Sequence, residues 1–340
     1  GSPGSGLNIR IRGISTNGDS RPLILVDGNI IEDLSVINPN DIKSVNVLKD
    51  ATAGIYGVLA ANGVILIETK TGRKNSDIRV SVDSYIGFQT STKKIDLIDN
   101  VYDYANYVNG AAINGGSDAK FANVPGPRLT FFADDVLNPI TTYTDWQDAV
   151  FDVAPMQNAN VNFSGGTEKL SYSFGASYLN QDGIVGLDKS NFNRTTARTS
   201  LQYDVSDKLK LSATGIYTSS NKNNLPEGGI GSVLYGALNS DPITTPRSTT
   251  TGSGYGETIN SAREVVNPLA MIENTYNTNH IDKISATFGI NYEFLDGLKA
   301  ESRYQFNHAV SLSDVFRPVF NYGTGKQGTV DDDPNIIKDD

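Results

Sequence analysis

The residue types that most often carry chemistry are scarce in this chain and lie far apart. His280 and His308 are the only histidines, and neither has flanking residues that could complete a metal site or a catalytic pair. The run Ser164-Gly165-Gly166 lacks the G-x-S-x-G pattern of a nucleophile elbow and fits a hairpin turn instead. The absence of cysteine removes thiolate chemistry and disulfides. We therefore expect no catalytic residue, no metal, no cofactor and no enzyme activity.

Acidic side chains gather near the C-terminus, in Asp331-Asp332-Asp333 and in Asp339-Asp340. Carboxylate oxygens are ligands that Ca²⁺ prefers, but the run lacks the spacing and the central glycine of an EF-hand loop. Runs of like charge are commonly solvated surfaces. We interpret this segment as a solvated loop, with calcium binding as the alternative.

The charged residues of the N-terminal segment have two interpretations. Placed inside a protein, they could form ion pairs that act as a latch, because removing one partner of a buried pair is costly. Placed at a wet surface, they would simply keep that surface soluble. The residues concerned are Arg10, Arg12, Asp27, Lys49 and Asp50.

Residues 9–70 have the pattern of a small mixed α/β unit. Short apolar runs typical of strands alternate with Gly, Asn and Asp turns and with brief helical pieces. Asp27-Gly28 ends the first run, Pro39-Asn40-Asp41 suits a helical turn, and Asn62-Gly63 suits a tight turn. The expected strands are 23–26, 45–48 and 64–67, and Asp50 is expected to cap an Ala-rich helical segment at 51–57.

This segment resembles the plug domain of the SusC/RagA-like TonB-dependent outer-membrane transporters. The matching residues, in a fixed order, are Ile11-Arg12-Gly13, Pro22-Leu23, Val26-Asp27-Gly28, Asn38-Pro39, Asp41-Ile42, Val47-Leu48-Lys49-Asp50-Ala51, Ile55-Tyr56-Gly57 and Ala61-Asn62-Gly63-Val64. The resemblance implies a plug signature with structural and gating roles, and it assigns no ligand-binding residue. That signature comprises Arg10, Arg12, Gly13, Asp27, Gly28, Asn38, Pro39, Asp41, Lys49, Asp50, Tyr56, Gly57, Asn62 and Gly63.

After the N-terminal segment the chain changes to the period-two alternation of half-buried strands. We expect strands at 78–89, 158–165, 170–180, 192–205, 209–218, 283–294 and 298–311. Helical pieces are expected at 99–110, 144–151, 230–238 and 269–274, and long loops at 115–142 and 219–279. Short turns that alternate with long loops are typical of membrane β-barrels.

The stretch 144–185 extends the resemblance to the first barrel hairpin of SusC-like proteins, through T-D-W-Q-D-A-V-F, A-P-M-Q-N, N-F-S-G-G-T-E-K and Y-L-N-Q-D-G-I-V. The expected fold is a mixed α/β plug followed by antiparallel transmembrane β-barrel strands, predominantly β. We place the plug domain at 1–72, incomplete at its N-terminus, and the N-terminal part of the barrel at 73–340. The expected strands number about seven, whereas a closed membrane barrel needs at least about 8 and cannot leave an open edge in lipid. We therefore expect a fragment that begins inside the plug and contains an incomplete barrel.

Composition excludes some classes of partner. The chain has 28 Lys and Arg against 38 Asp and Glu, and its pI is near 4.8, so no nucleic acid is expected, because phosphate binding needs clustered basic residues. No apolar run is long enough for a transmembrane helix. A mean hydropathy of -0.30 fits a soluble β protein or a barrel, because barrel strands alternate polar and apolar residues.

The resemblance implies a function and a set of partners. It implies active import of a nutrient, an oligosaccharide or sometimes a peptide, across the outer membrane of a Gram-negative, Bacteroidota-like bacterium. It implies contact with outer-membrane lipid, a SusD-like surface lipoprotein, and TonB–ExbB–ExbD, whose binding segment is absent from this chain. The alternative is a secreted soluble glycan-binding β protein. The two differ in the strand faces, since a barrel turns apolar side chains outward and a soluble sandwich packs them together.

Overall fold

The structure is a computed structural model of the 340-residue chain. It describes residues 2–11, 13, 19–31, 34, 37–49, 51–98, 100–122, 130–133, 136–139, 143–259, 262, 264–323, 326 and 336–339. Side chains at 51–52, 122, 130–133, 136–139, 187 and 336–339 lie outside that description.

Residues 2–70 form a small α/β body, here called the N-terminal unit. Its 4-stranded sheet has the order β2-β1-β4-β3, with β1 parallel to β4 and the other neighbours antiparallel. The elements are β1 (Leu23–Val26), β2 (Asn29–Ile31), the 3-10 helix η2 (Pro39–Asp41), β3 (Ile42–Leu48), the 3-10 segment η3 (Ala51–Ala60) and β4 (Val64–Thr69). Apolar side chains from β1 and β4 form its core, in which Val64 is 0% exposed.

Local sequence explains the turns of the N-terminal unit. Asp27 and Gly28 adopt positive φ angles of 51° and 83° and reverse the chain after β1, which Asp and Gly tolerate best. Asn38 caps η2, since its side chain accepts a hydrogen bond from the backbone N–H of Asn40. The predicted helical segment at 51–57 extends to Ala60 and is broken by Gly57, whose φ is 67°.

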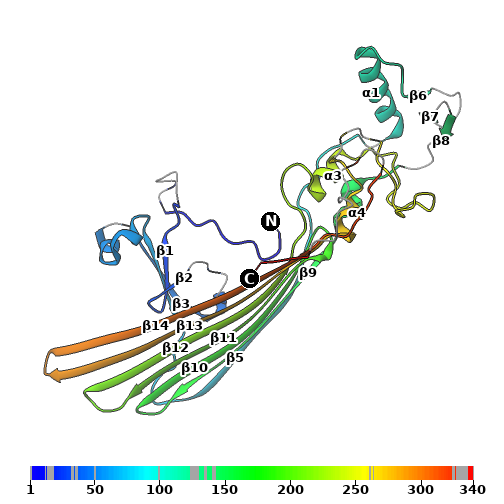
Figure 1. The fold of residues 1–340 in the computed structure, drawn as a ribbon. Helices are drawn as coiled ribbons and strands as arrows, with labels where there is room; N and C mark the ends of the chain where they lie inside the picture. The colour runs from blue at the N-terminus through cyan, green and yellow to red at the C-terminus, as the bar shows by residue number, and fades with distance from the viewer. Residues whose placement is uncertain are drawn as a thin grey trace.

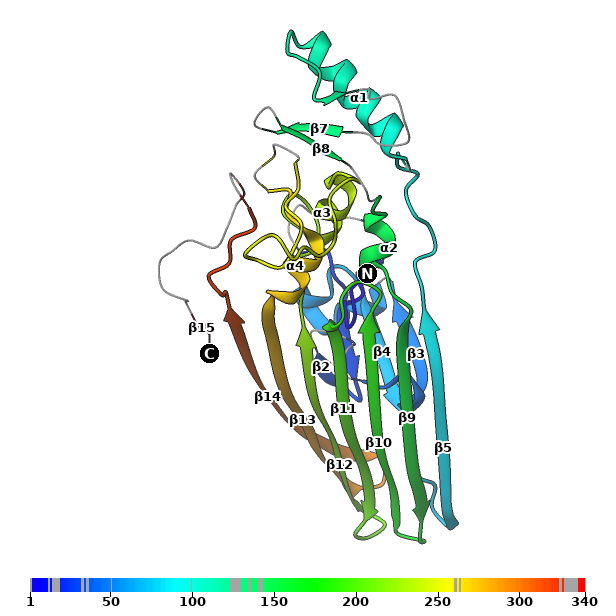
Figure 2. The same ribbon diagram turned by 90° about the vertical axis from the view of Figure 1, so that its right-hand side faces the viewer.

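The rest of the chain builds a large antiparallel 8-stranded sheet with the order β15-β14-β13-β12-β11-β10-β9-β5. Its strands are β5 (Ser76–Gln89), β9 (Ala154–Gly166), β10 (Leu170–Gly183), β11 (Leu187–Asp204), β12 (Leu209–Asn223), β13 (Tyr276–Leu295), β14 (Leu298–Phe316) and β15 (Ile336–Asp339). Each of the strands predicted after the N-terminal unit is present and is longer than predicted. Figures 1 and 2 show the sheet as a curved wall with the N-terminal unit lying against one face.

The two ends of the wall differ. One end has short turns, and the other carries long connections that contain α1 (Val101–Asn114), α2 (Trp146–Val150), α3 (Val233–Asn239) and α4 (Pro268–Glu273). Figure 2 shows these helices gathered beyond one end of the strands, here called the loop end. Among the described helices, none is long and apolar enough to cross a membrane.

Two predictions at the loop end are wrong. The helix expected to stop at Gly110 continues to Asn114, where Gly115 forms its C-cap, because an interior glycine weakens a helix without necessarily ending it. The segment 115–142, predicted as a loop, contains a 3-stranded sheet of β6 (Phe121–Ala122), β7 (Thr130–Ala133) and β8 (Val136–Pro139). These strands are too short for the alternation signal to reveal.

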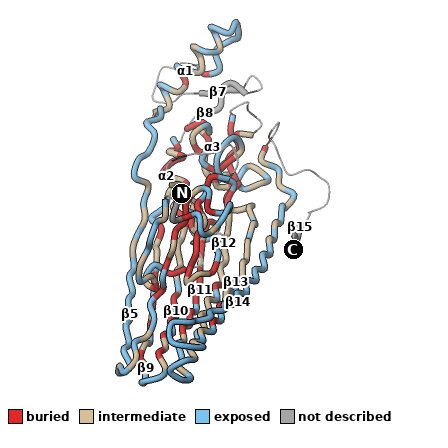
Figure 3. The backbone as a smooth tube through the Cα atoms, turned by 90° about the vertical axis from the view of Figure 1, so that its left-hand side faces the viewer, coloured by how far each residue is buried: buried red, intermediate tan, exposed pale blue. Residues whose placement is uncertain are grey.

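The two faces of the large sheet have opposite chemistry. On β10, Ser171, Ser173 and Ser177 face the N-terminal unit and are buried, whereas Phe174 and Tyr178 point away and are each 46% exposed. The same alternation runs through β9 and β11, and Figure 3 shows the edge strand β5 exposed along its length. Polar residues inside and aromatic residues outside is the arrangement of a membrane barrel, and the reverse of a soluble sandwich.

Candidate functional site: the contact between the N-terminal unit and the wall

A buried arginine of the wall anchors the N-terminal unit. Arg198 of β11 is 4% exposed, and its Nε lies 3.5 Å from Oδ1 of Asp41, which is 2% exposed. Its Nη1 donates to the backbone oxygen of Lys70 at 2.7 Å and to Oγ1 of Thr69 at 3.2 Å. Its Nη2 donates to Oγ of Ser173 at 3.1 Å. One guanidinium thus joins three segments of the protein.

The network continues into the N-terminal unit through Thr69. The backbone N–H of Thr69 donates to Oδ1 of Asp27 at 2.8 Å, and its hydroxyl donates to Oδ2 at 2.6 Å. Asp41 and Asp27 therefore reach the same arginine, the first directly and the second through a hydroxyl. The neighbouring Glu68 is exposed, and hydrogen bonds from Ser44 and Lys43 lower the pKa of its carboxyl.

A glycine in the wall makes room for the ion pair. Gly175 of β10 lies opposite Arg198 in the strand register, and a Cβ at this position would lie 3.0 Å from Oδ1 of Asp41. Any larger side chain would compete with the carboxylate for the same space. Charged groups are costly to bury unless they are paired. Glycine at position 175 therefore leaves the space in which Asp41 can pair with Arg198.

Three further polar contacts lie beside this network, two on one side of it and one on the other. The amides of Asn29 in β2 and Asn307 in β14 donate to each other reciprocally, at 2.9 and 2.8 Å, and Gln305 donates to the backbone oxygen of Gly28. On the opposite side, the amide of Asn38 donates to Oδ1 of Asn160 at 3.3 Å. The contact also has an apolar part, where Ile216 of β12 packs against the core cluster of the unit.

The structure brings four of the predicted signature residues to this contact, namely Asp27, Gly28, Asn38 and Asp41. Tyr56 instead packs inside the N-terminal unit, and Asn62 donates to the backbone oxygen of Asp19. Gly63 has a φ of 88° at its turn. The exposed members are Arg10, Gly13, Pro39, Lys49 and Gly57. Arg12 and Asp50 lie outside the described residues.

The wall residues of this contact were not predicted. Arg198, Ser173, Asn160 and Asn307 stand on strands that the alternation pattern located, at positions where the inward face is polar. An arginine among the small polar residues of one strand face was the signal that the sequence offered. Its partner could not be identified, because the two residues lie far apart in the sequence.

The histidines have ordinary structural surroundings. The ring of His280 contacts Oδ1 of Asn221 at 2.6 Å and Oδ2 of Asp282 at 2.9 Å, and His308 stacks on Phe306. Within the part of the chain that the structure describes, no cluster of His, Cys, Asp or Glu could hold a metal ion. The run Asp331-Asp332-Asp333 lies outside the described residues.

Comparisons with known proteins give one consistent result. Residues 1–64 match the family described as TonB-dependent Receptor Plug Domain. The TonB-dependent receptor SusC of Bacteroides thetaiotaomicron is 34% identical, over 79% of this chain and 26% of that protein. A TonB-dependent receptor of Formosa agariphila is 33% identical, over 86% of this chain and 28% of that protein. The chain thus spans less than a third of the length of these relatives.

Solved structures agree on the fold. The structure of the RagAB peptide transporter superposes with a TM-score of 0.66 at 21% identity, and the match covers 90% of this chain and 36% of that chain. The RagAB peptide importer in its 'open-open' state gives a TM-score of 0.65 at 20% identity. The N-terminal unit therefore has the fold of a plug and the large sheet that of an incomplete β-barrel.

Proposed function

We propose that this chain, which belongs to the SusC-like family of TonB-dependent outer-membrane transporters, forms the gate and part of the wall of a nutrient importer. The family consists of transporters of the Gram-negative outer membrane, not of enzymes. The N-terminal unit would be the gate, and β5 with β9–β15 would be the wall.

One observation carries this proposal: a folded unit lies on the polar face of a sheet whose other face is apolar, and polar contacts hold it there. Such a unit blocks the lumen of a barrel at rest. The alternative of a soluble glycan-binding protein is disfavoured, because Phe174 and Tyr178 face away from the protein while serines are buried.

We place the boundary between gate and wall at residue 72. Two contacts support it: Lys70 still hydrogen-bonds to Asp41 inside the unit, whereas Lys74 already forms an ion pair with Asp204 of the wall. The chain passes here from the α/β unit to the large sheet. Residues 1–72 could therefore move while residues 73–340 remain in the membrane.

Gating would consist of breaking the contact centred on Arg198. Each hydrogen bond contributes a net of about 0.5–1.5 kcal/mol, since water replaces the lost partner. When the whole unit leaves, Asp41 and Arg198 are both rehydrated, and neither charge stays buried alone. A pull from TonB–ExbB–ExbD on the polypeptide that precedes the unit would supply the work, and Asp27, Gly28, Asn38 and Asp41 would be the gating residues.

The cargo would be an oligosaccharide or a peptide, and a SusD-like lipoprotein would cap the barrel from outside. The test uses cells that express the natural full-length polypeptide. Uptake of labelled oligosaccharides and peptides is measured with and without TonB, and the affinity-purified transporter is examined for a lipoprotein partner. We expect energised uptake that disappears without TonB. Uptake that persists unchanged without TonB would overturn the proposal.

A further inference from the structure

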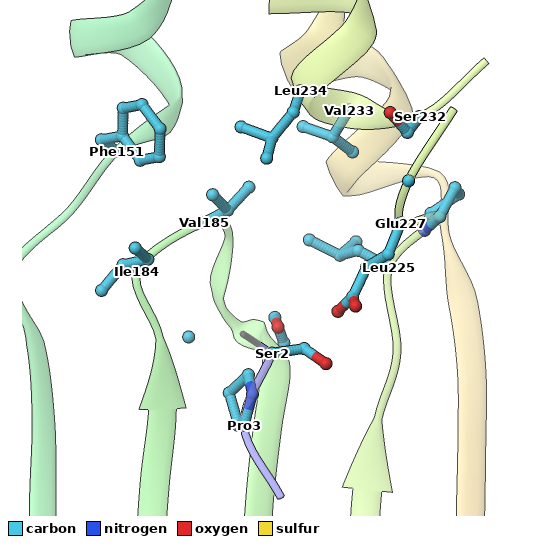
Figure 4. Close-up of a pocket in the computed structure, with 14 residues that line it drawn as sticks. Ser2, Pro3, Phe151, Ile184, Val185, Leu225, Glu227, Ser232, Val233 and Leu234 are labelled. Atoms are coloured by element: carbon cyan, nitrogen blue, oxygen red, sulfur yellow. The ribbon is translucent and has the colours of Figure 1, made fainter. Parts of the chain in front are cut away.

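A cavity of ≈ 250 Å³ lies at the loop end, between the start of the N-terminal unit and the segment that leads into α3. Figure 4 shows Leu225, Val233 and Leu234 on one side, Val185 on another, and Pro3 below. The gate, the wall and the external loops each supply part of its surface.

The gate supplies the floor of the cavity. Gly4 has a φ of 63°, and a Cβ there would lie 2.3 Å from the ring of Phe192, so only glycine lets the backbone lie against that ring. The backbone N–H of Gly4 donates to Gln181 at 3.4 Å, and Lys222 donates to Oγ of Ser2 at 3.4 Å. Residues 2–4 therefore lie across β10, β11 and β12.

The walls of the cavity are fixed by a packed core. Leu225 and Val233 are 6% and 1% exposed and belong to a cluster with Trp146 and Met271. The close approach of Gly186 adds to this, because a Cβ there would lie 2.6 Å from Leu225. A site lined by side chains that are held elsewhere keeps its shape when empty, which lowers the cost of binding.

The lining selects for an apolar group. Apart from the hydroxyls of Ser2, Ser190 and Ser232 and the carboxylate of Glu227, the lining side chains are apolar, and none is Lys, Arg or His. Ser232 is engaged as the N-cap of α3. A sugar ring placed here would leave several of its hydroxyls without hydrogen-bond partners, which disfavours its binding. An apolar cavity of about 150 Å³ already holds benzene, so an aromatic or branched aliphatic side chain fits.

We propose that this cavity is a cargo subsite for one apolar side chain of a peptide. The inference rests on the proposed function and names the cargo class. The carboxylate of Glu227 adds a negative charge to the lining, which complements the ammonium group of a peptide. Because Pro3 is part of the gate, occupation of the subsite contacts the element that must move, and departure of the gate removes the floor under the bound side chain.

The experiment uses the full-length transporter and the tripeptides Gly-Phe-Gly and Gly-Ser-Gly, with maltotriose as the sugar probe. Leu234 is 42% exposed, so Leu234→Trp can fill the cavity without disturbing the core. The matched control is Ile230→Trp, which adds the same ring at a position that is 74% exposed. We expect Leu234→Trp to weaken binding of Gly-Phe-Gly at least tenfold and to leave Gly-Ser-Gly unchanged. Ile230→Trp should change neither.

Equal effects of Leu234→Trp on both tripeptides, or a wild-type protein that does not prefer Gly-Phe-Gly, would overturn the subsite. TonB-dependent uptake of maltotriose without any peptide uptake would also overturn it, while the importer proposal would stand. Uptake that ignores TonB for every probe would instead contradict the proposed function itself.

Discussion

The inside of the gate and its outer surface against the wall are built on opposite principles. Inside, Val26, Val64 and Ile67 are 2%, 0% and 3% exposed and pack in an apolar core. At the surface, Asp41 meets Arg198, and Asn29, Asn38 and Thr69 bond to polar groups of the wall or of the gate. Apolar packing thus holds the gate together, whereas mainly polar contacts attach it to the wall.

The difference teaches how such a body can be released. Exposing one buried aliphatic side chain to water costs about 1.5–3 kcal/mol, and no solvent group compensates for it. A polar contact instead exchanges its partner for water at about 0.5–1.5 kcal/mol per hydrogen bond. Under a pull, the contact with the wall should therefore yield before the core of the gate.

The largest effect is expected from breaking the buried ion pair on one side. Arg198→Met leaves Asp41 buried without its cation, which should weaken the attachment of the gate by about 3–5 kcal/mol. The loss is measured in the full-length protein by the protection of Ser177→Cys, a wall position that the seated gate covers, from a water-soluble maleimide. Adding Asp41→Leu should restore much of the protection. Unchanged protection in Arg198→Met would mean that this ion pair does not hold the gate on the wall.

A core substitution should act on the gate itself. Ile67→Ala deletes a side chain that is 3% exposed, so we expect the gate to lose about 3 kcal/mol of stability. This loss of stability is measured by denaturant unfolding, with the proteolysis of residues 1–72 as the readout. Val58→Ala is the matched control, because Val58 is 92% exposed and should lose almost nothing. Equal losses for both variants would mean that the apolar core is not what holds the gate together.

A charged residue on the outward face of the wall should destabilise the barrel. Phe174 is 46% exposed on the apolar face of β10, and Arg there should destabilise the barrel in the membrane by about 2 kcal/mol. Folding into lipid vesicles in urea measures the difference. Phe174→Leu serves as the control that keeps the position apolar. A harmless Phe174→Arg would show that this face does not meet lipid.

The smallest effect is expected at the amide pair. Asn307→Ala and Asn29→Ala should each weaken the gate contact by about 1 kcal/mol, and the double variant should cost little more than either single one, since each removes the same pair. A double-mutant cycle, read by the same protection of Ser177→Cys from a water-soluble maleimide, tests this. Strictly additive losses would mean that the two amides do not interact.

Patterns local in sequence predicted most of the fold. The alternation on β10 located the strand, and the Asp27-Gly28 turn ended β1 where the structure ends it. The strands of the large sheet were predicted too short, because pairing with neighbouring strands extends them beyond the alternating residues. β2 was missed, since Asn29–Ile31 is too short to show a period.

The gate contact could be predicted only from one side. The family resemblance singled out Asp27 and Asp41 of the gate, but nothing in the sequence joined them to Arg198. That link depends on the strand register, which puts Gly175 opposite Arg198, and on the seating of the gate against β11. Register and seating are long-range properties that no local pattern contains.

The most direct test asks whether the gate leaves the wall as a folded body. The chain has no cysteine, so two cysteine pairs can be compared in the full-length transporter with a short bis-methanethiosulfonate cross-linker, which forms a reducible disulfide with each cysteine and releases methanesulfinate. Asn29→Cys with Asn307→Cys ties the gate to the wall, and Asn46→Cys with Leu66→Cys ties β3 to β4 inside the gate, where the two residues are in register. We predict that the first tether abolishes TonB-dependent uptake until it is reduced and that the second leaves uptake intact. Uptake that is blocked as strongly by the internal tether would mean that the gate must unfold, which contradicts the account.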